Sequence, residues 1–106
     1  MAAGLFVSEW QGTVGDYDRT LERVQREVEP DPRCVCHAMA VTGDNQFSVV
    51  EVWSDRAAME AWFERARPVI EEGADHQQLS WNMYDVHSLL TGEAAAPESQ
   101  NRLQDA

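Results

Sequence analysis

The chain has 106 residues, of which 43% are hydrophobic, so it is long enough for one folded domain with its own core. Eight basic residues stand against 19 acidic ones, which leaves a formal net charge of −11. Nucleic acids and anionic membrane surfaces both attract cationic proteins, so this charge argues against either as a partner. The sequence contains no run of about eighteen apolar residues and no secretory signal pattern, so we expect no membrane span and no secretion.

The first half of the chain predicts a strand, a helix and a second strand. Residues Leu5–Gln11 alternate in character as a strand does. Thr13, followed three residues later by Asp16, resembles a capping box, and apolar residues at steps of three and four then predict a helix that ends before Pro30. Cys34–Val41 is nearly continuous in apolar character, which predicts a buried second strand.

The central stretch predicts a hairpin, a third strand and a second helix. Turn residues Thr42–Asn45 lead into a strand rich in Val and Phe that ends at Trp53. Side-chain oxygens and helical spacing then predict a helix over about Asp55–Glu72, interrupted by a kink or a fresh start at Pro68. Gly73 is a natural stop for this helix.

A last strand is expected over Gln78–Leu90, so that residues 1–91 form the domain and residues 92–106 a flexible tail. The order β-α-β-β-α-β predicts a ferredoxin-like α+β fold, with two helices on one face of a four-stranded antiparallel sheet. The second and third strands are apolar on both faces, and no further element remains to cover the second face. We therefore expect a homodimer in which two sheets pack against each other.

The two cysteines, Cys34 and Cys36, alternate along the second predicted strand. Their Cα atoms would lie about 6.5–7 Å apart, at or beyond the limit for a disulfide. His37 points the other way in such a strand, so we expect buried, reduced thiols rather than a nucleophile, in a cytoplasmic protein.

Residues 49–63, VVEVWSDRAAMEAWF, resemble the signature of the dimeric α+β barrel superfamily. The segment is most similar to the antibiotic biosynthesis monooxygenase family, in which a VWES-x-x-A-F motif joins the third strand to the second helix. Tyr17-Asp18, His37 and Val86–Leu89 are also similar to small members of that superfamily. The resemblance covers about Leu5–Leu90 and implies a dimeric α+β barrel.

The same resemblance implies a ligand cavity between the helices and the subunit's own sheet. Members of the superfamily act as cofactor-independent oxygenases of polyketide phenols, haem degraders, polyketide cyclases or isomerases. The haem degraders carry an Asn in the first strand and a His on the second helix, and this sequence has neither. Haem degradation is therefore not expected.

Glu51 and His37 are the first candidates for acid–base chemistry. Burial of Glu51 among apolar strand residues would raise its pKa into the range of a general base, although Glu51 could instead face solvent or pair with Arg33 or Arg56. His37 titrates near neutrality. A tight hairpin would pair Cys36 with Glu51 and put His37 on the opposite face, whereas a three-residue loop or a bulge would put His37 on the face of Glu51.

His87 shares strand parity with Trp81, so it could face the cavity or could anchor the last strand through a hydrogen bond. A metal set of His37, His87 and Glu51 would lack local ligand spacing, and we expect no metal. Aromatic side chains would form flat walls for an aromatic ligand: Trp53, Trp62, Tyr17, Trp81 and Trp10.

Taken together, these patterns and the resemblance predict an enzyme of polyketide-type secondary metabolism that oxygenates a phenolic or enolic aromatic molecule without a cofactor. Glu51 or His37 would remove a proton, the carbanion would react with O₂, and His87 would stabilise the developing oxyanion. A cyclase, dehydratase or isomerase that uses the same pocket is one alternative. A non-catalytic ligand-binding or accessory subunit is another.

Overall fold

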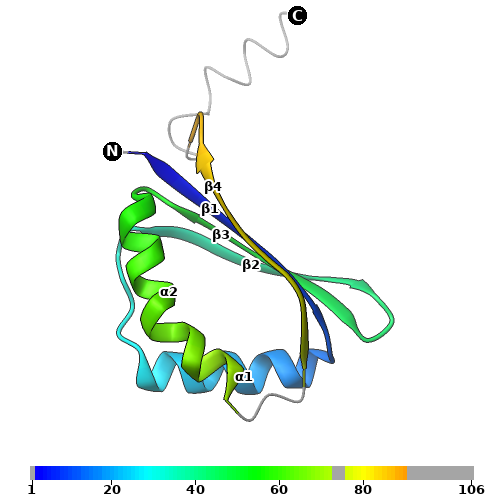
Figure 1. Ribbon diagram of the computed structural model, residues 1–106. Coiled ribbons are helices and arrows are strands. Elements are labelled where there is room, and N and C mark those ends of the chain that lie inside the picture. The colour runs from blue at the N-terminus through cyan, green and yellow to red at the C-terminus, as the bar shows by residue number, and fades with distance from the viewer. Residues whose placement is uncertain (1, 73–75, 91–106) are drawn as a thin grey trace, which may run out of the picture.

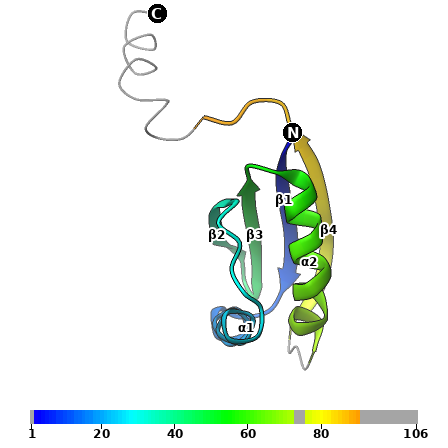
Figure 2. The ribbon, with the colours of Figure 1, turned by 90° about the vertical axis from the view of Figure 1, so that its left-hand side faces the viewer.

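The computed structural model describes residues 2–72 and 76–90. Its elements follow the predicted order: β1 (Ala3–Gln11), α1 (Val14–Glu27), β2 (Cys34–Gly43), β3 (Gln46–Trp53), α2 (Arg56–Glu71) and β4 (Gln77–Val86). The strands form one antiparallel sheet in the order β2-β3-β1-β4, and both helices cover the same face of it (Figures 1 and 2). This is the ferredoxin-like α+β fold that the sequence predicts. Within the described residues, no helix is long and apolar enough to cross a membrane.

The helices begin where their capping residues predict. The Asp16 amide donates to Thr13 Oγ1 at 3.1 Å, and the Thr13 amide donates to Asp16 Oδ2 at 2.8 Å, which completes the capping box of α1. The bond from the Thr13 amide, with a further contribution from the Thr13 side chain, lowers the pKa of Asp16, because it favours the carboxylate form. At the start of α2, Asp55 Oδ1 accepts a hydrogen bond from the Ala57 amide at 3.0 Å.

Two predictions about helix and strand continuity differ from the structure. Of the two alternatives at Pro68, a fresh helix is absent, because Pro68 lies inside α2, which continues to Glu71. Strand β4 ends at Val86, four residues before the expected Leu90, so His87 follows the strand. The predicted stop at Gly73 and the tail over residues 92–106 lie outside the described residues.

The core lies between the helices and the inner face of the sheet. Strand residues alternate, so Phe6, Ser8 and Trp10 of β1 are buried on this face, while Leu5 and Val7 point to the other. Helix α2 packs against β1 and β3. The main buried cluster comprises Phe6, Trp10, Phe47, Val49, Trp53, Ala58, Met59 and Phe63.

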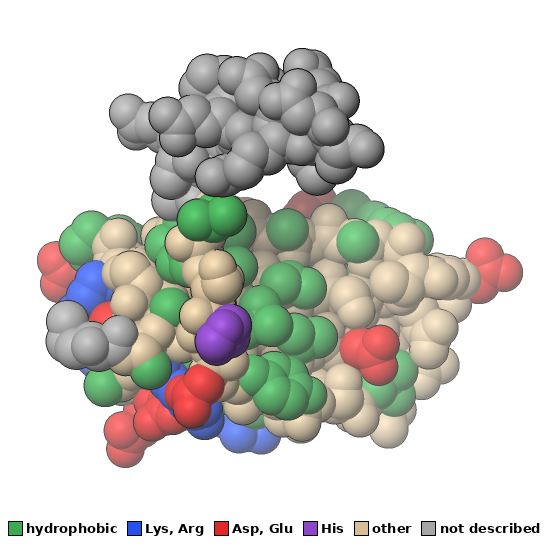
Figure 3. Space-filling model, turned by 90° about the horizontal axis from the view of Figure 1, so that it is seen from above, with side chains coloured by type: hydrophobic (Ala, Val, Ile, Leu, Met, Phe, Trp, Pro, Cys, Tyr) green, Lys and Arg blue, Asp and Glu red, His purple; other side chains and the backbone are tan. Residues whose placement is uncertain are grey.

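Among residues 2–72 and 76–90, no helix lies on the outer face of the sheet (Figure 2). Figure 3 shows hydrophobic side chains gathered across the middle of this face. The register places apolar residues of all four strands there: Leu5, Val7, Cys36, Ala38, Ala40, Val50, Val52 and Tyr84. The sequence prediction that the second face is also apolar is therefore confirmed. The prediction that the second strand is buried is wrong for the single chain: no residue of β2 is buried, because β2 is an edge strand and its outer face is uncovered.

Candidate functional site

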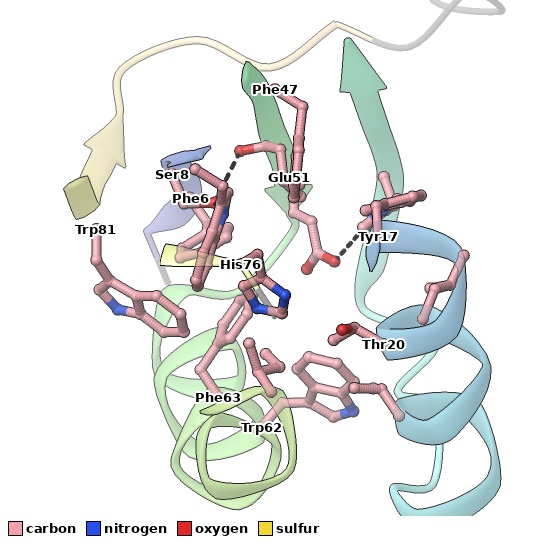
Figure 4. Close-up of a pocket in the computed structure, with 16 residues that line it drawn as sticks. Phe6, Ser8, Tyr17, Thr20, Phe47, Glu51, Trp62, Phe63, His76 and Trp81 are labelled. Carbon is pink, nitrogen blue, oxygen red and sulfur yellow. Dashed lines mark hydrogen bonds and ion pairs between the residues drawn. The ribbon is translucent and has the colours of Figure 1, made fainter. Parts of the chain in front are cut away.

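A cavity of about 90 Å³ lies between the sheet and the two helices (Figure 4). Aromatic rings make up much of its wall, and several of them contact one another: Phe63 stacks on Phe6 with centroids 4.2 Å apart, and Trp81 meets Phe6 edge to face at 4.7 Å. The rest of the wall includes a small number of residues with polar or ionisable side chains: Ser8, Tyr17, Thr20, His37, Glu51 and His76. The cavity is thus suited to a flat, mainly apolar molecule with a small number of polar groups.

His37 and Glu51 face each other across the β2–β3 ladder. Their Cα atoms are paired in the register, and His37 Nδ1 lies 2.6 Å from Glu51 Oε2. An irregularity between Val41 and Gly43 shifts the register next to the hairpin, so His37 rather than Cys36 pairs with Glu51. Of the two arrangements that the sequence left open, the bulged one is present.

Glu51 is only 6% exposed, yet its carboxylate has several donors around it. The Trp53 indole N–H donates to Oε1 at 2.8 Å, and the Cys34 thiol lies 3.8 Å from the same oxygen. Together with His37 on Oε2, these donors satisfy a buried carboxylate that would otherwise be costly. Glu51 is therefore held in one orientation beneath His37.

Tyr17, on α1, reaches the other nitrogen of the same imidazole. Its hydroxyl oxygen lies 2.5 Å from His37 Nε2, and the two rings stack with centroids 5.9 Å apart. Burial raises the pKa of Tyr17, and the negative charges of Asp18 and Glu51 raise it further. The phenol is thus protonated at neutral pH and completes a chain of hydrogen bonds, Tyr17–His37–Glu51–Trp53.

Cys34 is part of this environment but not a nucleophile. Burial raises the pKa of its thiol to about 12, and the adjacent Glu51 carboxylate contributes in the same direction. A thiol with such a pKa is almost entirely protonated at neutral pH. Both cysteines are free, but the prediction that both are buried is wrong: Cys34 is half-buried, and Cys36 is exposed because it lies on the outer face of β2.

A second, larger cavity of about 460 Å³ is also bordered by His37 and Glu51. It shares part of its wall with the first, and the shared residues are Leu21, Val24, His37, Glu51 and Trp62. Trp53 lines only this second cavity. The His37–Glu51 pair therefore borders both spaces.

The structure brings together most of the residues singled out from the sequence. Glu51, His37, Tyr17, Trp62, Trp81 and Trp10 all line the first cavity. Trp53 is 1% exposed and acts through its hydrogen bond to Glu51 rather than as a wall of that cavity. His87 is exposed, follows β4 and lines neither cavity, so the structure does not bring it to the other candidates.

Several lining residues were not singled out from the sequence. Ser8 is fully buried, and its hydroxyl accepts a hydrogen bond from the Trp10 indole at 2.7 Å. Its parity with Trp10 on β1 could have placed it here. The His76 and Trp10 rings meet edge to face, with their centroids 4.8 Å apart. No local pattern in the sequence predicts that contact.

Within residues 2–72 and 76–90, no three His, Cys, Asp or Glu side chains gather as a metal-binding group. The three-ligand set of His37, His87 and Glu51 is accordingly not assembled.

Comparisons with known proteins place the chain by its fold. No protein-family model and no curated protein matches the sequence. Solved structures do match: a candidate antibiotic biosynthesis monooxygenase from Chloroflexus aurantiacus J-10-fl has a TM-score of 0.59 at 12% identity, over 85% of this chain and 98% of its own. SnoaB, a cofactor-independent oxygenase from Streptomyces nogalater, matches with a TM-score of 0.57 at 15% identity. The match covers 87% of this chain and 98% of SnoaB.

A conserved protein from Methanosarcina mazei Go1 matches with a TM-score of 0.58 at 16% identity, over 79% of this chain and 92% of its own. At these identities the likeness concerns the fold. The expected similarity to antibiotic biosynthesis monooxygenases is confirmed at that level.

Proposed function

We propose that this protein is a small-molecule enzyme that oxygenates a phenolic or enolic aromatic substrate without a cofactor, with His37 as its general base. The observation that carries the proposal is the His37–Glu51 pair, 2.6 Å between Nδ1 and Oε2, at the edge of an aromatic-lined cavity. A histidine oriented by a carboxylate is a common arrangement for removing a proton near neutral pH.

The cavity supports an uncharged, planar substrate. Its wall offers ring faces and edges from Phe6, Phe63, Trp62 and Trp81, which contact aromatic ligands favourably (Figure 4). The net charge of −11 also disfavours a polyanionic substrate. Few polar atoms enter the cavity, so those of the hydrogen-bond chain would orient the ionisable group of the substrate.

The proposed reaction begins when the base removes a proton from the phenol or enol. The resulting anion is electron-rich enough to transfer an electron to O₂ and to form a carbon–oxygen bond. One oxygen atom remains on the substrate as a carbonyl, and the other leaves as water with the hydrogen of the oxidised carbon and the proton that the base removed in the first step. Glu51 stabilises the imidazolium that forms in the first step.

The fold comparison supports this choice among reactions, because SnoaB is described as a cofactor-independent oxygenase and shares the fold. Its low identity leaves the substrate to be found by experiment. A cyclisation or dehydration would need the same base and the same shaped cavity, so product analysis must separate these reactions.

We further propose that the protein is a homodimer through the outer face of its sheet. Apolar side chains of all four strands lie on this face (Figure 3), and neither helix of the described residues covers it (Figure 2). A contiguous apolar surface of this kind is unusual on a monomer, and two copies related by twofold symmetry would bury it.

The test is oxygen uptake by metal-stripped protein with a panel of anthrone- and naphthol-type phenols, followed by mass analysis of the products. We expect uptake with one oxygen atom incorporated for wild type and for His87→Gln, and strongly reduced uptake for His37→Gln. The two variants are a matched pair, since His87 lies outside both cavities. A product lighter by one water, without uptake, would replace the proposal with a cyclase or dehydratase; binding without any product would indicate a binding subunit.

A further inference from the structure

The hydrogen bonds around His37 have a direction that follows from their chemistry. The Trp53 indole can only donate, so Glu51 accepts at Oε1. As a carboxylate, Glu51 also accepts at Oε2, which requires a proton on His37 Nδ1. In the neutral imidazole, Nε2 then bears the lone pair, and the Tyr17 hydroxyl donates to it at 2.5 Å.

With the hydrogen bonds in this direction, the basic nitrogen of His37, Nε2, is already occupied by the Tyr17 hydroxyl. Its lone pair is occupied by the Tyr17 proton, and the Tyr17 ring stacks over the imidazole at 5.9 Å. The Tyr17 oxygen donates through its hydrogen and so keeps its lone pairs free to accept, and Tyr17 lines the cavity. A substrate hydroxyl in the cavity can therefore reach the base through the Tyr17 oxygen without displacing any residue of the chain.

We propose that Tyr17 is a catalytic residue that relays the substrate proton to His37, rather than only a wall of the pocket. This inference rests on the proposed function, in that it assigns the first proton transfer of that reaction. The substrate O–H bond breaks as a new O–H bond forms on Tyr17, while the original Tyr17 O–H bond breaks as Nε2–H forms. The products are a substrate oxyanion, a neutral tyrosine and an imidazolium beside the Glu51 carboxylate.

The first test needs no substrate. Nitrogen-15 NMR of the histidines, with His37 assigned by its loss in His37→Gln, reports which ring nitrogen carries the proton. We expect a protonated Nδ1 and an unprotonated Nε2 that shifts in Tyr17→Phe but not in Tyr84→Phe. Tyr84 is the matched control, because it lies on the opposite face of the sheet from His37 and lines neither cavity. A proton on Nε2 would reverse the hydrogen bond and overturn the relay.

The second test uses 2-naphthol under anaerobic conditions, where its absorption distinguishes the bound naphthol from the naphtholate and no oxygenation competes. We expect the bound naphtholate-to-naphthol ratio to fall by at least about tenfold in Tyr17→Phe, with little change in affinity, and to be unchanged in Tyr84→Phe. An undiminished ratio in Tyr17→Phe would show that His37 takes the proton directly, and would overturn the inference.

The two proposals fail in different ways. Tyr17-dependent ionisation of 2-naphthol without oxygen uptake by any phenol would support the relay and reject the oxygenase. Oxygen uptake that is equally fast in wild type and Tyr17→Phe would support the oxygenase and reject the relay.

Discussion

His37 and Glu51 occupy paired positions on β2 and β3, and their side chains meet on the inner face, with Nδ1 2.6 Å from Oε2. The pairing depends on the register shift between Val41 and Gly43. Asn45, in the hairpin, has a positive φ of 55° and accepts a hydrogen bond from the Gly12 amide through its carbonyl at 2.8 Å. The hairpin is thereby tied to the end of β1, which stabilises the conformation that presents His37 to the cavity.

Replacing Glu51 with Gln should lower kcat for oxygen uptake by about 10²–10⁴-fold while KM changes little. The amide keeps the shape of the side chain but carries no charge to stabilise an imidazolium at His37, 2.6 Å away. Steady-state kinetics over a range of phenol concentrations measure both constants. Glu22→Gln, on an exposed surface of α1, is the control. Equal turnover in Glu51→Gln would remove Glu51 from the mechanism.

Replacing Ser8 with Ala should lower the free energy of unfolding by about 1–3 kcal/mol, because it leaves a buried indole N–H without its acceptor. Ser8 is 0% exposed and accepts from Trp10 at 2.7 Å. Urea unfolding followed by tryptophan fluorescence measures the loss. Ser80→Ala, on the outer face beside Glu9, should change stability by less than about 0.5 kcal/mol. Equal effects of the two changes would contradict the importance of the Ser8–Trp10 bond.

Val50→Lys should convert the proposed dimer into a monomer. Val50 lies on the outer face between Val7 of β1 and Ala38 of β2, so a lysine there would place a charge in the centre of the apolar surface. Light scattering after size-exclusion chromatography measures the mass. Val14→Lys, at an exposed position 50% accessible on α1, should leave the mass unchanged. A wild-type protein that is monomeric at all concentrations would reject the dimer.

Iodoacetamide should modify Cys34 slowly in the native protein at pH 8. Burial and the Glu51 carboxylate raise its pKa to about 12, so little thiolate is present. Mass spectrometry of a Cys36→Ala background, native and denatured, measures the rate. Adding Glu51→Gln should accelerate the native reaction, because it removes the nearby negative charge. Equal rates in the native and denatured protein would contradict a raised pKa.

The same thiol links stability to alkaline pH. The folded state retains the Cys34 proton above the ordinary pKa of 9.0, whereas the unfolded chain loses it. The contribution of Cys34 to stability is therefore fully present below pH 9.0 and decreases as the pH rises toward 12. Urea unfolding of the wild type and of Cys34→Ser across this range should show a steeper loss of stability for the wild type.

Much of the fold was predictable because its signals are local. The capping box at Thr13, the cap at Asp55 and the apolar spacing of α1 and α2 each act within a few residues, and all are present in the structure. The alternation along β1 likewise predicted a strand, whereas the structure shows that Phe6, Ser8 and Trp10 are the residues on the inner face. Local sequence signals predicted the ends of elements less well: β4 ends at Val86, whereas the sequence predicted an end at Leu90.

The composition of the site depended on contacts between distant segments. A one-residue bulge in β2 decides which face His37 occupies, and no pattern in residues 34–43 distinguishes the two registers. The same holds for Tyr17 of α1, whose hydroxyl contacts His37 of β2, and for His76, whose ring contacts Trp10, because each pair joins segments that are far apart in the sequence. The sequence by itself determined the order, type and capping of the elements, because these follow from short-range periodicity. Only the tertiary structure decided that Tyr17, His37, Glu51 and Trp53 form one hydrogen-bonded chain, because strand register and helix packing are set by long-range burial.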